Sequence, residues 1–216
     1  MKLTYFNVRG LAETSRILLA IMEENYEDFR YPLNIIDLKT FNMEKVEFEN
    51  DKKENKLINS LNKVPFLEVD GVTIPQSKAI ERYLATRGNM MGDSPLEYAR
   101  IDSICECIRD FKDAYQKVRN DKDKETATNT WFNETLPEKL SLLDNILGKE
   151  DNMFSVGNRL SLADVIIYSF IAQFFDDKER SLSATDNTNV MRNIVNNVSN
   201  NVNVVKWLSI RPETEM

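Results

Sequence analysis

The sequence predicts a small α/β domain followed by an all-helical domain. The first part of the chain alternates short strand-like segments with helical ones, whereas strand signals disappear from the rest. An Asp70-Gly71 pair, the preferred two-residue turn of a hairpin, separates two strand-like segments. We therefore expect an α/β domain over residues 1–87, a linker over 88–94 and a helical domain over 95–216.

The elements of the first domain follow from local composition. Residues 2–6 carry Leu, Thr, Tyr and Phe, which suits a short buried strand. Apolar residues then recur at helical spacing over about 12–25, and a second strand is expected over 26–31. Residues 37–62 are polar and rich in Asn, Lys and Glu. We expect irregular loop and a poor helix in that segment.

A hairpin over residues 65–75 and a helix over about 77–87 complete this domain. The hairpin is predicted because Gly71 tolerates the positive φ that a type I′ turn requires. The helix is predicted from a stripe of apolar residues at helical spacing, Ala79, Ile80, Tyr83 and Leu84.

The second domain consists of predicted helices. One runs from residue 96 past Tyr115, another spans about 130–147 with a kink at Pro137, and a short last helix ends before Pro212. Residues 162–175 are apolar almost all round, so that helix should be buried at the centre of the domain. Ser161 and Asp164 have the spacing of a capping box at its start.

Composition excludes several kinds of chemistry. The 216 residues contain no His, which rules out a Ser-His-Asp triad and any His-ligated metal. Two Cys cannot form a Cys₄ cluster, and the six Gly form no phosphate-binding loop. A net charge of −7 without a basic block argues against nucleic acid and anionic membranes.

The segments indicate a cytoplasmic protein without membrane insertion. The N-terminal residues are patterned like a strand and lack the apolar run of a signal peptide. Cys105 and Cys107 point to different faces of a predicted helix and cannot pair with each other.

Three features of the first domain together indicate a binding site. Tyr5 ends the first strand, and a cis Val64-Pro65 bond would present backbone groups to a ligand. Gln76-Ser77 begins a helix, where free N–H groups and the positive end of the dipole attract a carboxylate. We infer a site for an anionic, peptide-like ligand.

The residues of this site and the segments around them resemble those of the cytosolic glutathione transferases, most closely the sigma class. Five segments carry the resemblance, in order and at sensible spacing over nearly the whole chain: KLTYFNVRGLAE (2–13), KVPFLEVDG (63–71), QSKAIERYL (76–84), NRLSLADVIIY (158–168) and WLSIRP (207–212). The resemblance implies a thioredoxin-like N-terminal domain, a helical C-terminal domain, a homodimer and glutathione as cosubstrate.

The resemblance also implies that the hydroxyl of Tyr5 is catalytic. A free thiol has a pKa near 8.5, and the thiolate is the nucleophile. A neutral phenol that donates a hydrogen bond to the sulfur stabilises the thiolate and lowers the pKa of the thiol. This mechanism requires neither His nor a metal, in agreement with the composition.

Glutathione-binding roles carry over from the family to matching positions. Gln76 and Ser77 would hold the γ-glutamyl carboxylate, and the backbone of Val64, before cis Pro65, would pair with the cysteinyl part. Asp110 would reach the glutathione amine of the neighbouring subunit.

Several residues are candidates for binding the glycyl end of glutathione, because the chain carries an insertion near residues 49–62. The sigma class has an aromatic residue followed four positions later by Lys, and both Phe48 with Lys52 and Phe41 with Lys45 fit that spacing. Lys63 is a further candidate for the glycyl carboxylate.

The acceptor would be a small apolar electrophile, bound between the domains by Phe6, Leu11, Lys112 and Tyr115. The sigma class includes prostaglandin D synthases, which have a cationic residue at the position of Leu11. Leu11 lacks that charge, which favours general conjugation over the prostaglandin isomerase reaction.

Two alternatives remain open. Glu106 and Asp110 resemble part of a carboxylate cluster that binds a divalent metal in some relatives, but Arg109 intrudes and we expect no metal. The family also contains non-catalytic scaffold proteins, although the retained Tyr5 and Gln76-Ser77 favour an enzyme.

Overall fold

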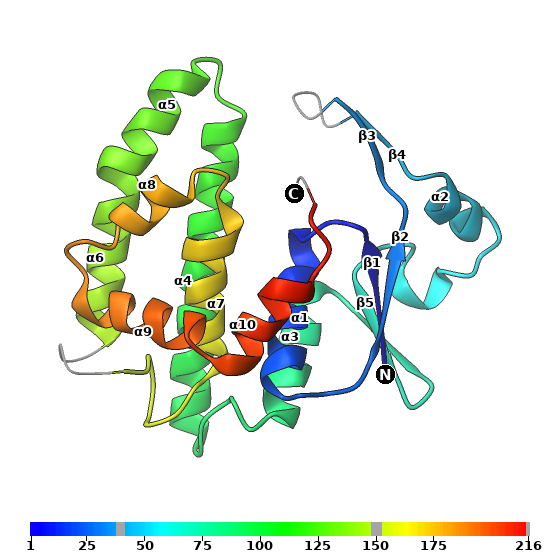
Figure 1. Cartoon of the computed structure of the whole chain (residues 1–216), viewed down its shortest axis with the longest axis horizontal. Coiled ribbons are helices and arrows are strands. Elements are labelled where there is room, and N and C mark those ends of the chain that lie inside the picture. The colour runs from blue at the N-terminus through cyan, green and yellow to red at the C-terminus, as the bar shows by residue number, and fades with distance from the viewer. Residues whose placement is uncertain (38–41, 148–152, 215–216) are drawn as a thin grey trace. The chain divides into compact units, whose positions relative to one another are not determined.

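The computed structural model describes residues 1–37, 42–147 and 153–214. The chain forms two compact units, shown in Figure 1. Unit 1 comprises Met1–Leu84 together with Lys206–Met216, and unit 2 comprises Ala85–Val205. The domain limits expected from the sequence, at residues 87 and 95, stay a prediction.

A four-stranded mixed sheet forms the frame of unit 1, in the order β2-β1-β5-β6. The strands are β1 (Lys2–Phe6), β2 (Glu27–Tyr31), β5 (Phe66–Val69) and β6 (Val72–Pro75). β1 runs parallel to β2 and antiparallel to β5, and β5 pairs with β6 in the predicted hairpin. Asp70 and Gly71 both have positive φ, 50° and 80°, as a type I′ turn requires.

Helices lie on both faces of this sheet (Figure 1). A short 3₁₀ turn, η1 (Gly10–Ala12), leads into α1 (Glu13–Ile21), and α3 (Ser77–Arg87) follows the hairpin with its predicted limits. α1 and α3 lie on one face, and α2 (Val46–Lys53) lies on the other. The last helix, α10 (Val202–Ile210), precedes Pro212 as predicted.

A second hairpin extends into the segment expected to be irregular, residues 37–62, and its first strand ends where that segment begins. β3 (Asn34–Asp37) pairs antiparallel with β4 (Asn42–Glu44), followed by α2 and the 3₁₀ turn η2 (Ile58–Ser60). The prediction missed the two strands because a few apolar residues stand among many polar ones, and the register shifts within the pair. Residues 38–41 lie outside the described part of the chain.

Unit 2 consists of helices. They are α4 (Pro95–Arg119), α5 (Lys124–Thr130), the π-helical turn η3 (Trp131–Thr135), α6 (Leu136–Leu147), α7 (Leu162–Ser169), the π-helical turn η4 (Phe170–Phe174), α8 (Lys178–Ser183) and α9 (Asn189–Ser199). The helix expected over about 130–147 changes from π-helical to α-helical hydrogen bonding between Thr135 and Leu136, and the kink expected at Pro137 stays a prediction. Pro137 has no N–H for the carbonyl of Asn133, so the regular hydrogen-bond ladder is interrupted there.

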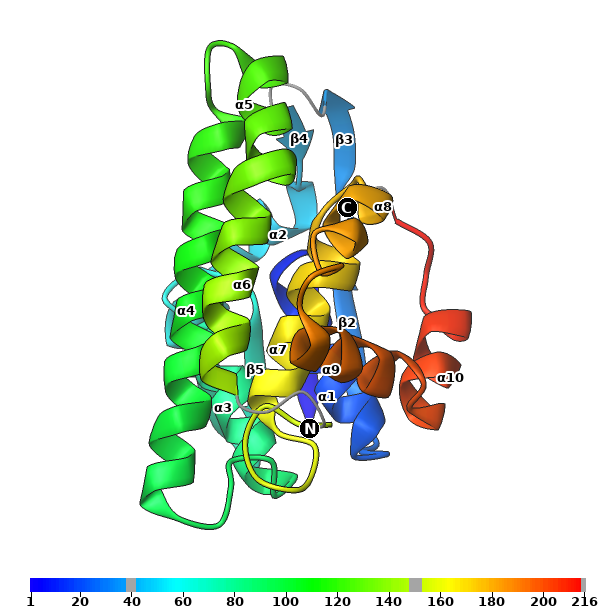
Figure 2. The same cartoon turned by 90° about the vertical axis from the view of Figure 1, so that its left-hand side faces the viewer.

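Helix α7 is at the centre of unit 2, next to α4 and α9 (Figure 2), and all of its residues are buried. The predicted capping box is present at its start. The backbone N–H of Ser161 donates to Asp164 Oδ2 at 2.7 Å, and the N–H of Ser155 donates to Asp164 Oδ1 at 2.6 Å. In the described part of the chain, no helix has both the length and the apolar character of a membrane span.

Candidate functional site

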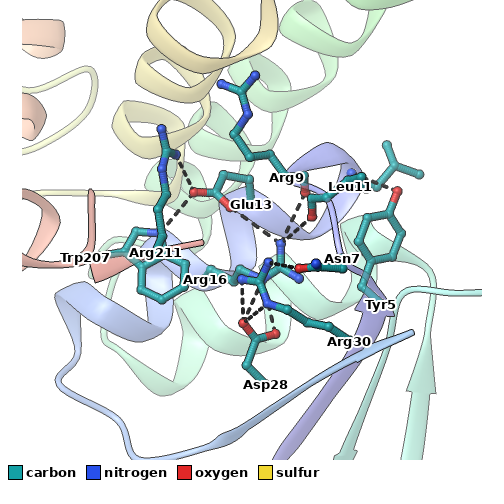
Figure 3. Close-up of polar contacts among 11 residues, drawn as sticks. Tyr5, Asn7, Arg9, Leu11, Glu13, Arg16, Asp28, Arg30, Trp207 and Arg211 are labelled. Atoms are coloured by element: carbon teal, nitrogen blue, oxygen red, sulfur yellow. Dashed lines mark hydrogen bonds and ion pairs between the residues drawn. The ribbon is translucent and has the colours of Figure 1, made fainter. Parts of the chain in front are cut away.

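Tyr5 lies near the C-terminal end of β1 with 8% of its surface exposed (Figure 3). Its hydroxyl oxygen accepts a hydrogen bond from the backbone N–H of Leu11 at 3.2 Å. The turn between these residues passes so close to the ring that a Cβ on Gly10 would lie 2.7 Å from the hydroxyl oxygen. Gly10 also has φ +40°, so two constraints favour glycine there.

The Tyr5 phenol stays protonated at neutral pH. Burial raises the pKa of Tyr5 above its ordinary value, while the Leu11 N–H and the charge of Arg16 partly offset this effect. A protonated hydroxyl both accepts and donates. Because Leu11 supplies the hydrogen bond that the oxygen accepts, the hydroxyl hydrogen is available for a further acceptor.

Sheet register brings the other predicted backbone groups to the same edge. Thr4 pairs with Phe66, and Phe66 pairs with Pro75. One step further along each strand, the register places Tyr5 beside Pro65, and Pro65 beside Gln76. The sequence features that indicated a binding site therefore belong to one edge of one sheet.

The groups at this edge have the geometry expected of a carboxylate site. The Val64-Pro65 peptide bond is cis, as predicted. Gln76 has φ +74° and is exposed, and its carbonyl accepts from the N–H of Ile80 at 3.0 Å. Gln76 thus caps α3, and the first N–H groups of that helix lie at its positively polarised end. Ser77 is the first residue of the helix and is half-buried.

The candidates for the glycyl end of glutathione occupy different surroundings. Phe48 is buried in a cluster with Tyr31, Leu57 and Phe66, and its ring meets the edge of Phe6 at 5.1 Å between centroids. Its ring therefore contributes to packing.

Two lysines flank Phe48 along the chain. The Lys45 ammonium lies 5.9 Å from the Phe6 ring and 5.5 Å from the Phe48 ring. Lys52 is exposed and pairs with Glu49 at 3.8 Å, and Lys63 is exposed just before Val64. Phe41, the partner proposed for Lys45, lies outside the described residues.

The predicted residues of unit 2 lie on α4. Asp110 is exposed. Burial raises the pKa of the Cys107 thiol, and the charges of Asp110 and Glu106 raise it further. Glu106 itself forms an ion pair with Arg109. Across the described residues, His, Cys, Asp and Glu form no group of three or more that could hold a metal ion.

Lys112 and Tyr115 are next to aromatic side chains. The Lys112 ammonium lies 5.3 Å from the Phe174 ring. The Tyr115 ring contacts Trp131 at 5.2 Å and Phe175 at 4.8 Å, and burial raises the pKa of Tyr115. Tyr115 is therefore part of an aromatic cluster inside unit 2.

Sequence reasoning missed the charged residues behind Tyr5. Arg16 is fully buried and its Nη1 donates to the carbonyl of Val8 at 2.8 Å. Glu13 is also buried and accepts from Trp207 and Arg211 at the other end of the chain. The only local signal was the spacing of Glu13 and Arg16, one helical turn apart.

Comparison with known proteins shows which protein family this chain matches. A model of the glutathione S-transferase N-terminal domain matches residues 1–86, and a model of the C-terminal domain matches residues 109–211. The chain is 34% identical to hematopoietic prostaglandin D synthase from Gallus gallus, over 99% of this chain and 97% of that protein. It is 28% identical to a glutathione S-transferase from Plasmodium yoelii yoelii, over 95% and 91%.

A solved structure shares the same architecture. Monomeric Na-GST-3, a glutathione S-transferase from the hookworm Necator americanus, has a TM-score of 0.78 and 26% identity to this chain. The match covers 100% of this chain and 98% of that one.

Proposed function

This chain belongs to the glutathione S-transferase family, and we propose that it conjugates glutathione to small apolar electrophiles with Tyr5 stabilising the thiolate. The observation that carries the proposal is the hydrogen bonding of Tyr5. Its oxygen accepts from Leu11 while its hydrogen remains free to donate. A glutathione sulfur that accepts a hydrogen bond from this hydroxyl would be stabilised as the thiolate, which is the nucleophilic form.

The rest of the site would bind glutathione through its peptide groups and charges. Val64, before cis Pro65, offers backbone groups for antiparallel pairing with the cysteinyl part. The start of α3, at Gln76 and Ser77, suits the γ-glutamyl carboxylate because N–H groups and the helix dipole converge there.

Three lysines are candidates for binding the glycyl carboxylate. Lys45 is favoured because its ammonium lies 5.9 Å from the ring of Phe6, the neighbour of Tyr5 in the chain. Lys52 and Lys63 remain alternatives, since an ammonium on a flexible stem can reach several positions. Phe48 would support this end by packing against Phe6 rather than by touching the ligand.

The acceptor would be apolar. The hydrophobic side chain of Leu11 is 58% exposed, and the Leu11 N–H donates to the Tyr5 oxygen. An apolar surface would therefore begin beside the reacting sulfur. Phe6 on β1, with Lys112 and Tyr115 of α4, are the further residues that the family pattern assigns to the acceptor.

We place the protein in the sigma class as a cytoplasmic homodimer, with Asp110 reaching the partner's glutathione amine. Relatives named hematopoietic prostaglandin D synthase support this placement. The uncharged Leu11 favours conjugation over the isomerase reaction. The dimer needs its own measurement, by light scattering, since one similar structure is described as monomeric.

Turnover of a chlorinated nitrobenzene by the wild type and by Tyr5→Phe tests the catalytic role. Loss of one donor to the reacting anion should lower kcat/KM by about 10²-fold at pH 6.5. Glutathione affinity, measured by calorimetry, should change far less, because the hydroxyl acts on the sulfur alone.

Tyr26→Phe is the matched control. It removes a buried phenol oxygen of unit 1 that has no hydrogen-bond partner among the described residues, so turnover should be unchanged. Equal turnover by Tyr5→Phe and wild type would contradict the assignment.

A further inference from the structure

Five charged side chains of alternating sign form a chain within unit 1 (Figure 3). Arg211 Nη1 contacts Glu13 Oε1 at 2.7 Å, and Glu13 Oε2 contacts Arg16 Nη1 at 3.5 Å. Arg16 Nε lies 3.2 Å from Asp28, which also pairs with Arg30 at 2.7 Å. We refer to Arg211, Glu13, Arg16, Asp28 and Arg30 as the charge chain.

The charge chain holds the turn that follows β1. Arg16 Nη1 donates to the carbonyl of Val8 at 2.8 Å and lies 3.4 Å from that of Arg9. Arg30 Nη1 donates to Asn7 Oδ1 at 3.4 Å. Three consecutive residues of the turn are thus bound by its cations.

The same turn determines the hydrogen bond at Tyr5. Gly10 and Leu11 come directly after the three bound residues, and Leu11 N–H is the donor to the phenol oxygen. The Arg16 guanidinium carbon lies 6.0 Å from the centre of the Tyr5 ring. A shift of Arg16 would therefore change both the hydrogen bond and the charge that the phenol experiences.

The position of Arg16 depends on the C-terminal residues. Glu13 is 4% exposed, and it accepts from Trp207 Nε1 at 3.0 Å as well as from Arg211. Removing one partner of a buried ion pair leaves the other charge uncompensated. Without Arg211, Glu13 would attract Arg16 more strongly and draw its Nη1 away from the Val8 carbonyl.

We propose that Arg211 and Trp207 are positioning residues for Tyr5, acting through Glu13 and Arg16 on the turn at residues 7–11. The C-terminal segment would thereby set the reactivity of the bound thiol from the opposite end of the chain. This inference rests on the proposed role of Tyr5 as the donor to glutathione sulfur.

The test compares Arg211→Met with wild type in the full-length protein. The pKa of the bound glutathione thiol is measured from the pH profile of kcat/KM and, separately, from thiolate absorbance. We expect that pKa to rise by about 0.5 to 1. At pH values below the thiol pKa, kcat/KM should therefore be about three- to tenfold lower than in the wild type. Above the thiol pKa the two proteins should converge, because the thiol then ionises without help.

Two variants make the result specific. Lys206→Met removes an equal charge from an exposed position on α10, the helix that ends just before Arg211, and should leave the profile unchanged. Arg211→Lys keeps the charge and should restore most of the wild-type profile. If Arg211→Met does not fold, Trp207→Phe removes a donor to Glu13 while keeping an aromatic ring, and should raise the thiol pKa in the same direction.

An unchanged pKa in a folded Arg211→Met or Trp207→Phe protein would overturn the proposal. An equal loss of activity at every pH would also overturn it, because it would indicate a purely structural role. The Tyr5→Phe variant separates the two proposals. If it leaves the thiol pKa unchanged, the proposed function fails. If it raises the thiol pKa and the C-terminal variants do not, only this inference fails.

Discussion

One buried carboxylate of unit 1 and one of unit 2 are satisfied in different ways. Asp164 of unit 2, 0% exposed, accepts from backbone and hydroxyl groups three and nine residues away. Glu13 of unit 1, 4% exposed, accepts from side chains 194 and 198 residues away. The local arrangement starts a helix, whereas the distant one connects the two ends of the chain.

The difference between the two carboxylates shows which contacts can be predicted from the spacing of residues in the sequence. Two of the donors around Asp164, the N–H and the hydroxyl of Ser161, follow from the capping geometry, and the third is the backbone N–H of Ser155 in the preceding loop. The donors around Glu13 are charged or aromatic side chains whose positions depend on the whole fold of unit 1. A local role can be predicted from spacing, but a pairing across the chain cannot.

The largest effect on stability is expected from Asp164→Ala. Three donors, the N–H groups of Ser155 and Ser161 and the Ser161 hydroxyl, would lose their buried acceptor, at a cost of about 4 kcal/mol of unfolding free energy. Urea denaturation measures this. Asp123→Ala, at the exposed cap of α5, is the control and should cost about 1 kcal/mol. Equal losses would mean that burial of the carboxylate is unimportant.

A smaller loss, about 2 kcal/mol, is expected from Glu13→Gln. The amide oxygen can still accept from Trp207 or Arg211, but the charge that compensates Arg16 is gone. Glu27→Gln, at an exposed ion pair with Lys2, should change stability little. If thermal and urea unfolding of Glu13→Gln match the wild type, the charge chain does not stabilise unit 1.

The smallest effect on stability is expected from an ion pair that joins distant residues but is exposed to solvent. Arg159 is 66 residues from Asp93 and pairs with it at 2.6 Å, but Asp93 is exposed. The Arg159 guanidinium lowers the pKa of Asp93 below its ordinary 3.8. The stability that this pair contributes is therefore present above pH 3.8 and lost as the pH falls through the lower, folded-state value.

Arg159→Met should abolish that small acid-dependent contribution. Melting temperatures of the two proteins, measured from about pH 5 down to about pH 2.5, should differ most at the upper end. The difference should shrink as the pH falls, to the part that comes from the hydrogen bonds of Arg159 with Asn89. A difference that grows as the pH falls would have the wrong sign for this pair.

Local patterns predicted much of the fold. The Asp70-Gly71 hairpin, the limits of α3 and the capping box of α7 follow from turn chemistry and helical periodicity within short windows. The β3–β4 hairpin was missed because its apolar residues are few and its register is irregular. There, pairing between the strands decided the structure.

The candidate site was predictable in part for the same reason. Tyr5, Pro65 and Gln76 each occupy the end or start of an element, where a motif can be seen in the chain itself. Their meeting at one edge follows from the strand register, which becomes visible once the sheet is assembled. Phe48 has a suitable spacing and also packs into a core, which spacing alone does not indicate, and its role at the glycyl end stays a prediction.

By itself, the sequence determined the two kinds of domain, the caps and turns, and the exclusion of His-based chemistry. These features depend on residue type and on neighbours within a few positions. The tertiary structure decided the surroundings of Tyr5: the Leu11 N–H on its oxygen, and near its ring the guanidinium of Arg16, which belongs to the charge chain that includes Arg211. Such contacts join residues far apart in the chain, and only the folded backbone brings their charges within a few ångströms.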